Sequence, residues 1–218
     1  MTYTGNVSVG GDADVRELPA LVISKLAVGP HDNNAYLLRC TATDEQVLVD
    51  AAAEPERLLE LVGDGGLAAV VTTHAHRDHW GALAEVVAAT GARTLAHADD
   101  AGDIGVAIDE TVPDGGTVHV GHVALTAIHL VGHTPGSIAL LYDDPTGAPH
   151  LFTGDCLFPG GVGNTWKDPE RFDSLYSGVV GRIFDRLPDE TWVYPGHGRD
   201  TTLGAERPHL AEWRERGW

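Results

Sequence analysis

Basic residues and cysteines are both scarce in this sequence of 218 residues. Only 14 Lys and Arg residues oppose 32 Asp and Glu residues, so the formal net charge is −18. Nucleic acids and anionic membrane surfaces would repel such a chain, and we expect neither as its partner. The two cysteines, Cys40 and Cys156, form no CxxC motif and are too few for a disulfide framework.

Long apolar runs are absent as well. No run approaches the roughly 20 residues that a membrane-spanning helix needs, and the first 20 residues lack the basic and apolar regions of a secretory signal. The composition, with 43% hydrophobic and 21% charged residues, is typical of a globular protein. We therefore expect one cytoplasmic domain over residues 1–218, with residues 1–20 as a loose lead-in. Nothing in the pattern specifies an oligomeric state.

The apolar pattern predicts strands that alternate with helices along most of the chain. Strands are expected over 21–28, 35–40, 46–50, 67–73, 92–97, 117–130 (two strands joined at Gly121), 137–143, 150–155 and 191–195. Helices are expected over 55–62, 80–90, 172–187 and 206–216. The strand–helix–strand order of 46–73 is typical of a parallel crossover. The acidic, glycine-rich stretch 98–117 is expected to be a solvated loop.

Histidine and aspartate crowd the segment HAHRDH, residues 74–79. Side chains two residues apart in an extended backbone point the same way, so His74 and His76 can bind one ion. Asp78 and His79 lie further round the turn and can reach a second ion. Imidazole and carboxylate ligands suit zinc, iron and manganese. Asp78 could instead act only as the N-cap of the helix predicted over 80–90.

Five predicted strands end at a potential metal ligand. These ligands are Asp50, the HAHRDH segment, His133, Asp155 and His197. Functional sites of α/β sheets form at the carboxyl ends of strands, so we expect these side chains to meet at one edge. Asp50 could also be an ordinary turn residue.

The motifs HAHRDH, GHTPGS, TGD and PGHG, in this order and spacing, resemble those of the metallo-β-lactamase superfamily. Within it the resemblance is to short glyoxalase II-like hydrolases, and it runs from about Asp50 to His197. It implies a mixed α/β (α+β) fold, a four-layer αββα sandwich with a binuclear metal site at one edge of the sheets. By the same resemblance the first metal is held by His74, His76 and His133, and the second by Asp78, His79 and His197. Asp155 bridges both metals, and Asp50 orients a ligand histidine.

The resemblance also implies the chemistry, which is hydrolysis of a small thioester or ester. Two divalent ions, most simply zinc with iron and manganese as alternatives, lower the pKa of a shared water and make hydroxide available near neutral pH. Asp78 and Asp155 are the carboxylates assigned to catalysis. No serine or cysteine nucleophile is required, because hydroxide attacks the acyl carbon and a thiolate is a good leaving group.

Two departures from glyoxalase II of the long type bear on the substrate. Only residues 198–218 follow His197, so no C-terminal glutathione-binding domain is expected. Asn164 and Trp166 stand where the family often has Arg and Asp, which argues against glutathione as the thiol carrier. The alternatives are a lactonase or other ester hydrolase with the same ligands, and an iron-dependent persulfide dioxygenase. Asp155 argues against antibiotic hydrolysis, since true metallo-β-lactamases lack Asp at the bridging position.

The loop over 157–171 is expected to border the substrate pocket. Its contributing side chains would be Phe158, Asn164, Trp166 and Lys167; the alternative is a plain surface loop. Cys156 is expected to be a small buried residue rather than a redox group. The histidines on predicted strands, His119, His122, His129 and His150, are interpreted as structural, although His129 could line the site.

Overall fold

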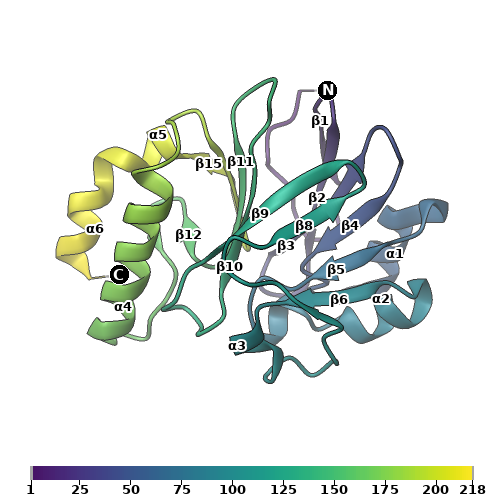
Figure 1. Ribbon diagram of the computed structural model, residues 1–218, viewed down its shortest axis with the longest axis horizontal. Coiled ribbons are helices and arrows are strands. Elements are labelled where there is room, and N and C mark those ends of the chain that lie inside the picture. The colour runs from purple at the N-terminus through teal and green to yellow at the C-terminus, as the bar shows by residue number, and fades with distance from the viewer. Residues whose placement is uncertain (1, 218) are drawn as a thin grey trace.

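The computed structural model describes residues 2–217, which form two large β-sheets packed between two layers of helices (Figure 1). The first sheet contains, in spatial order, β1 (Asp14–Glu17), β2 (Leu21–Val28), β3 (Asn33–Cys40), β4 (Gln46–Val49), β5 (Ala69–Val71), β6 (Arg93–Ala96) and β7 (Glu110–Thr111). The second contains β15 (Thr201–Thr202), β14 (Trp192–Pro195), β11 (His150–Gly154), β10 (Ile138–Tyr142), β9 (Val123–His129) and β8 (Thr117–Val120). A small hairpin pairs β12 (Leu157–Phe158) with β13 (Gly161–Val162).

Helices cover the outer face of each sheet. The first sheet is covered by α1 (Pro55–Val62) and α2 (Leu83–Thr90), and the second by α4 (Pro169–Val179) and α6 (Leu210–Arg216). Two further helices are short, α3 (Ala98–Ala101) and α5 (Leu203–Glu206). The arrangement confirms the predicted αββα sandwich.

Three apolar cores hold the four layers together. The central core lies between the sheets, where Tyr36, Phe152 and Tyr194 pack with ring centroids 4.7 to 5.6 Å apart. The sequence of strand β2 is almost continuously apolar because both of its faces are buried. Ile23 faces the central core and Leu26 faces α1 and α2, because a sheet covered on both sides buries both faces of its strands.

The topology brings several strand ends to one edge. Strands β4, β5 and β6 are parallel, which confirms the predicted crossover over 46–73. In the second sheet β11 runs parallel to β14, and β9 shares their direction because β10 is antiparallel to both β9 and β11. The segments that follow β4, β5, β9, β11 and β14 therefore leave the sheets on the same side.

Part of the predicted loose lead-in is a strand, whereas residues 2–13 lie in no helix or strand. Residues 14–17 form the edge strand β1, which pairs with β2. Gly5, ahead of this strand, is held by Lys25, whose side chain is fully buried and needs partners for its ammonium group. Its Nζ donates to Gly5 O at 2.8 Å and Gly198 O at 2.7 Å, and pairs with Asp200 at 2.6 Å.

Several predicted boundaries differ from the structure. The helix expected over 80–90 starts at Leu83 and is preceded by a 3₁₀ turn, Arg77–His79. The helix expected over 172–187 begins earlier, because Asp168 caps the amides of residues 170 and 171 and Pro169 starts the first turn. It continues as a π-helical segment, Val180–Phe184. The stretch 98–117 is not a simple loop, since it contains α3 and β7.

Among the described residues, no helix combines the length and the apolar character needed to cross a membrane.

Candidate metal centre

The predicted ligands meet at the edge where the strands end. One group of possible metal-binding atoms comes from His74, His76 and His133, and another from Asp78, His79 and His197. Within each group the ligand atoms lie no more than 4.8 Å apart. Such spacing is compatible with coordination of one ion per group. A third group, His74, His79 and Asp155, adds the seventh ligand position named from the sequence, so all seven are brought together.

Imidazole nitrogens face one another across each group. His76 Nδ1 lies 2.9 Å from His133 Nε2, and His79 Nε2 lies 3.2 Å from His197 Nε2. Two such nitrogens at this separation must share either a proton or a cation, because their lone pairs otherwise repel. Each pair of facing nitrogens is therefore suited to bind a cation.

Asp155 lies between the two groups. One of its oxygens is 3.3 Å from His79 Nε2, and the other is 3.5 Å from both His133 Nε2 and His197 Nε2. The backbone approaches this carboxylate closely at Gly196, where an added Cβ would lie 2.3 Å from Asp155 Oδ1. Only glycine fits there.

Buried atoms without partners support the fit of a metal. Among the described residues, His74 Nε2 and Asp155 Oδ1 are buried side-chain atoms for which no hydrogen bond is formed. An unpaired buried polar atom is costly. A cation bound by these atoms would remove that cost.

Partners outside the ligand set orient the rings. The Asp50 carboxylate accepts from His79 Nδ1 at 2.7 Å and from the amide of Thr73 at 2.8 Å. Asp50 has a left-handed backbone with φ of 59°, a strain that non-glycine residues rarely keep without a local reason. His133 Nδ1 donates to Asn164 O, and His197 Nδ1 donates to His31 O. Each hydrogen bond leaves Nε2 facing the centre, as in metal sites with oriented histidines.

The sequence analysis missed two residues that position this centre. Asn33 Nδ2 donates to Asp78 Oδ2 at 3.0 Å. Asp100, within the stretch predicted to be a solvated loop, is fully buried. Its carboxylate accepts from Ala75 N at 2.8 Å, and from Thr134 Oγ1 and Gly136 N at 2.6 Å each. Asp100 thereby joins the loop of His76 to the loop of His133. The sequence did not predict this role, because Asp100 lies in a stretch with several other acidic residues.

The histidines divide into two electrostatic classes. Burial lowers the pKa of His133 to about 4 and, together with neighbouring His79, lowers that of His74 well below its usual range. Burial also opposes the charged ring of His79, but the charge of Asp50 and contact with Asp155 outweigh it and raise its pKa to about 10. For His197, hydrogen bonds to Asp155 and Asp78 outweigh burial in the same way and raise the pKa to about 10.

These shifts predict that metal binding strengthens as pH rises. Both raised pKa values favour a proton on the His79–His197 pair near neutral pH, and an ion bound between the facing Nε2 atoms must displace it. The apparent Kd for zinc should fall about tenfold per pH unit for each proton released. Calorimetric titration in buffers of different ionisation enthalpy counts these protons. An affinity independent of pH between about 6 and 9 would contradict the prediction.

Protonation of His79 and His197 also makes the folding stability of the metal-free protein depend on pH. Both pKa values are raised above the ordinary 6.5, so the stabilisation is complete below about pH 6.5. It is lost as the pH rises through about 10.

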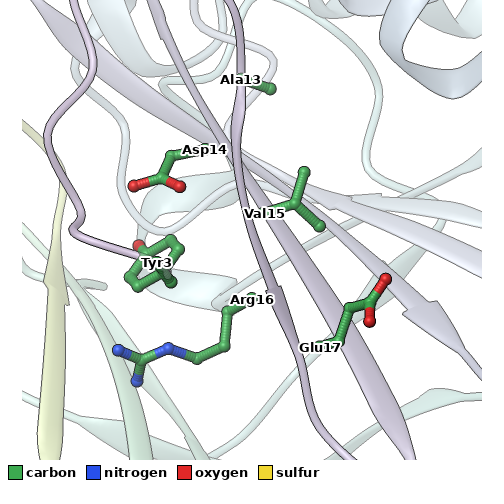
Figure 2. Close-up of a pocket in the computed structure, with 6 residues that line it drawn as sticks. All are labelled: Tyr3, Ala13, Asp14, Val15, Arg16 and Glu17. Carbon is green, nitrogen blue, oxygen red and sulfur yellow. The ribbon is translucent and has the colours of Figure 1, made fainter. Parts of the chain in front are cut away.

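Cavities flank the centre, but the largest of those described does not include it. That cavity, of about 560 Å³, is lined by Tyr3 and residues 13–17 beside β1 (Figure 2). A cavity of about 310 Å³ includes His76 and His133 among its lining residues, and one of about 360 Å³ includes Asp78. Chemistry rather than volume therefore identifies the site.

Of the four residues predicted to border the substrate pocket, only Trp166 lines the cavity beside His76 and His133. Trp166 lines the 310 Å³ cavity, with its ring stacked 5.5 Å from that of His133. Asn164 contributes its main-chain oxygen to His133. Phe158 lies with its ring centroid 6.3 Å from His197, and Lys167 is exposed. The last three are not among the residues that line that cavity.

The remaining predicted residues have structural surroundings. Cys156 is fully buried, as expected. His129 stacks on His97 with ring centroids 3.9 Å apart, and its Nε2 donates to Pro135 O. His150 is buried against Tyr194.

Comparison with known proteins decides the family. The sequence profile of the metallo-beta-lactamase superfamily matches residues 28–197, which include every ligand position described above. The chain belongs to the metallo-beta-lactamase superfamily. Within the superfamily it is a glyoxalase II-like member: it is 35% identical over 180 residues to a hydroxyacylglutathione hydrolase from a Polaromonas species. That match covers 81% of this chain and 66% of the relative, so the chain spans about two thirds of that hydrolase.

Two solved structures resemble the chain in sequence and in fold. The protein TTHA1623, in a di-iron-bound form, is 34% identical with a TM-score of 0.70, and the match covers 84% of this chain and 96% of that one. ETHE1 from Myxococcus xanthus is 30% identical with a TM-score of 0.75, covering 88% and 84% respectively. The family match, the fold and the His/Asp cluster all indicate a protein that binds divalent metal ions.

Proposed function

We propose that this protein is a metallohydrolase that holds two divalent ions, with zinc as the first candidate, and cleaves a small thioester. The position of Asp155 carries this proposal. Its carboxylate contacts His133 of one histidine group and both His79 and His197 of the other. A carboxylate so placed suits a bridge between two ions.

In this proposal His74, His76 and His133 would hold the first ion, and Asp78, His79 and His197 the second, as in the two groups described above. Asp155 would contribute to both sites, and Asp50 orients His79. When bound, the ions would supply Lewis acidity and lower the pKa of water. Hydrolysis then adds the oxygen of a water molecule to the acyl carbon, breaks the C–S bond and releases an acid and a thiol.

The residues around the centre fit hydrolysis without a covalent intermediate. Cys156 follows Asp155 directly, but its side chain is fully buried and burial raises the pKa of its thiol. A buried neutral thiol is a poor nucleophile. The similarity to a protein named hydroxyacylglutathione hydrolase supports a thioester as substrate.

The experiment that tests this proposal is hydrolysis of S-D-lactoylglutathione by zinc-loaded protein. The matched controls are protein stripped by chelation and the same sample after zinc is restored. We expect turnover that disappears on stripping and returns with zinc. Turnover of lactones or oxygen esters, with none on thioesters, would contradict the thioester assignment and favour the ester-hydrolase alternative.

A second candidate is an iron-dependent dioxygenase acting on persulfides. His74, His79 and Asp155 also form a compact set of two histidines and one carboxylate, which is the ligand type of non-haem iron oxygenases. The di-iron form of TTHA1623 is consistent with iron in such a centre. Oxygen consumption with glutathione persulfide by iron-loaded protein, without thioester hydrolysis by zinc-loaded protein, would favour this candidate.

A further inference from the structure

A groove continues from the metal centre along the first turn of α4. The 310 Å³ cavity beside His76 and His133 adjoins a second cavity of about 450 Å³. The two share Thr134, Pro135 and Arg171 in their linings. We call these two cavities together the Arg171 groove. Each has a volume within the range of small-molecule sites.

Arg171 presents a cation to this groove. Its Nε donates to Gly132 O at 2.8 Å, and its Nη2 donates to His133 O. These acceptors are neutral carbonyls. Within the described residues, no carboxylate forms an ion pair with Arg171, although seven other arginines have one: Arg39, Arg57, Arg93, Arg182, Arg207, Arg214 and Arg216. A guanidinium that lines a groove and has no ion-pair partner favours an anionic ligand.

Trp166 forms the wall between Arg171 and the metal centre. The guanidinium carbon of Arg171 lies 4.6 Å from the ring centroid of Trp166, which also packs on His133 and His76. Trp166 is nevertheless 52% exposed. Its φ of 55° and the 61° of Lys167 place two consecutive non-glycine residues in the left-handed region. Such strain commonly marks ligand-binding segments.

The charges around the groove limit the ligand further. The exposed carboxylates Asp103 and Glu170 and the buried Asp100 line its two cavities, and Arg171 is the single Lys or Arg among the residues given for this lining. A carrier with several phosphates would meet these carboxylates and be repelled. A carrier with one carboxylate could pair with Arg171 alone.

We propose that the Arg171 groove binds the thiol-carrier half of the thioester and that Arg171 selects carriers with a carboxylate near the sulfur. Trp166 covers the segment between the sulfur and that carboxylate. The acyl half then faces the His and Asp cluster. This inference rests on the proposed thioester hydrolysis and adds the class of carrier to it.

Two matched substrates test the carboxylate directly. The lactoyl thioesters of N-acetylcysteine and N-acetylcysteamine differ by one carboxylate. For the wild-type protein loaded with zinc we expect kcat/KM to favour the N-acetylcysteine thioester by about tenfold or more, the effect of one charge-assisted hydrogen bond. In Arg171→Gln this preference should vanish, mainly through KM. Arg171→Lys should restore part of it.

The ratio of kcat/KM for the two thioesters distinguishes carboxylate binding by Arg171 from a role of Arg171 in positioning the His133 loop. Arg171 also holds the His133 loop, so Arg171→Gln can lower both activities, but a purely structural role would lower them equally. Equal losses, or equal kcat/KM values in the wild type, would overturn the proposal. Arg186→Gln changes the net charge identically at an exposed position and should keep the preference.

The failure of the proposed function is distinguishable from failure of the groove. Metal-loaded protein that hydrolyses neither thioester would contradict thioester hydrolysis. Binding of the S-methyl thioethers of the same two carriers, followed by NMR titration, then tests the groove without turnover. Tighter binding of the carboxylate form in the wild type, and no difference in Arg171→Gln, would support the carboxylate site. Equal binding in the wild type would overturn it.

Discussion

Replacing Asp155 with alanine is expected to weaken binding at both halves of the metal centre and to reduce turnover by at least about 100-fold. Loss of even an outer partner of a metal site lowers affinity or activity by up to about 100-fold, and loss of a bridging ligand should cost no less. The physical reason is that its two oxygens face His79 on one side and His133 and His197 on the other. Metal content per chain, measured after dialysis, and kcat of the reconstituted variant check this prediction.

His76→Ala is the one-site control for Asp155→Ala. His76 belongs to one group only, so this variant should lose one ion per chain, retain the second, and lose nearly all turnover while staying folded. If Asp155→Ala also lost only one ion, the bridging position would be misassigned. If His76→Ala kept wild-type hydrolysis, the proposed site would be wrong.

Asp100→Ala is expected to lower the free energy of unfolding by about 3–5 kcal/mol, the range for breaking a buried, charged hydrogen-bond network. The fully buried carboxylate accepts from Ala75, Thr134 and Gly136, which would all lose their acceptor. For a chain of this length the Tm should fall by about 10 °C. Because Asp100 joins the loops of His76 and His133, zinc affinity should fall as well.

Asp99→Ala provides the matched control for Asp100. It removes the same charge one residue away, from a side chain that is 58% exposed. Exposed substitutions usually change stability by no more than about 0.5 kcal/mol. Thermal unfolding of the two metal-free variants, followed by zinc titration, compares their Tm values and their zinc affinities. Equal melting temperatures would show that the Asp100 network contributes little to the fold.

Local sequence contained much of the fold. The parallel crossover over 46–73 and the two strands joined at Gly121 were predictable because apolar periodicity and turn residues act over a few positions. Boundaries were less predictable, since the cap at Asp168 and the π-helical segment after α4 depend on geometry that a hydrophobic period does not encode.

Most of the candidate metal site was also foreseeable. Its ligands lie in short motifs, and motif spacing together with strand direction places His74, His133 and His197 at one edge. The partners of these ligands were not foreseeable. Asn33 reaches Asp78 from 45 residues away in sequence, and Asp100 looked like one of many acidic loop residues.

By itself, then, the sequence determined the superfamily resemblance, because the motifs that carry it are short-range patterns. The expected layer order and the candidate metal-binding side chains came through that resemblance. Only the tertiary structure decided which groups support them. It paired residues 14–17 with β2, placed Gly5 O against the buried Lys25 ammonium, and held Arg171 on the carbonyls of Gly132 and His133. Burial and charge pairing arise from contacts between segments far apart in the chain, and no local pattern records them.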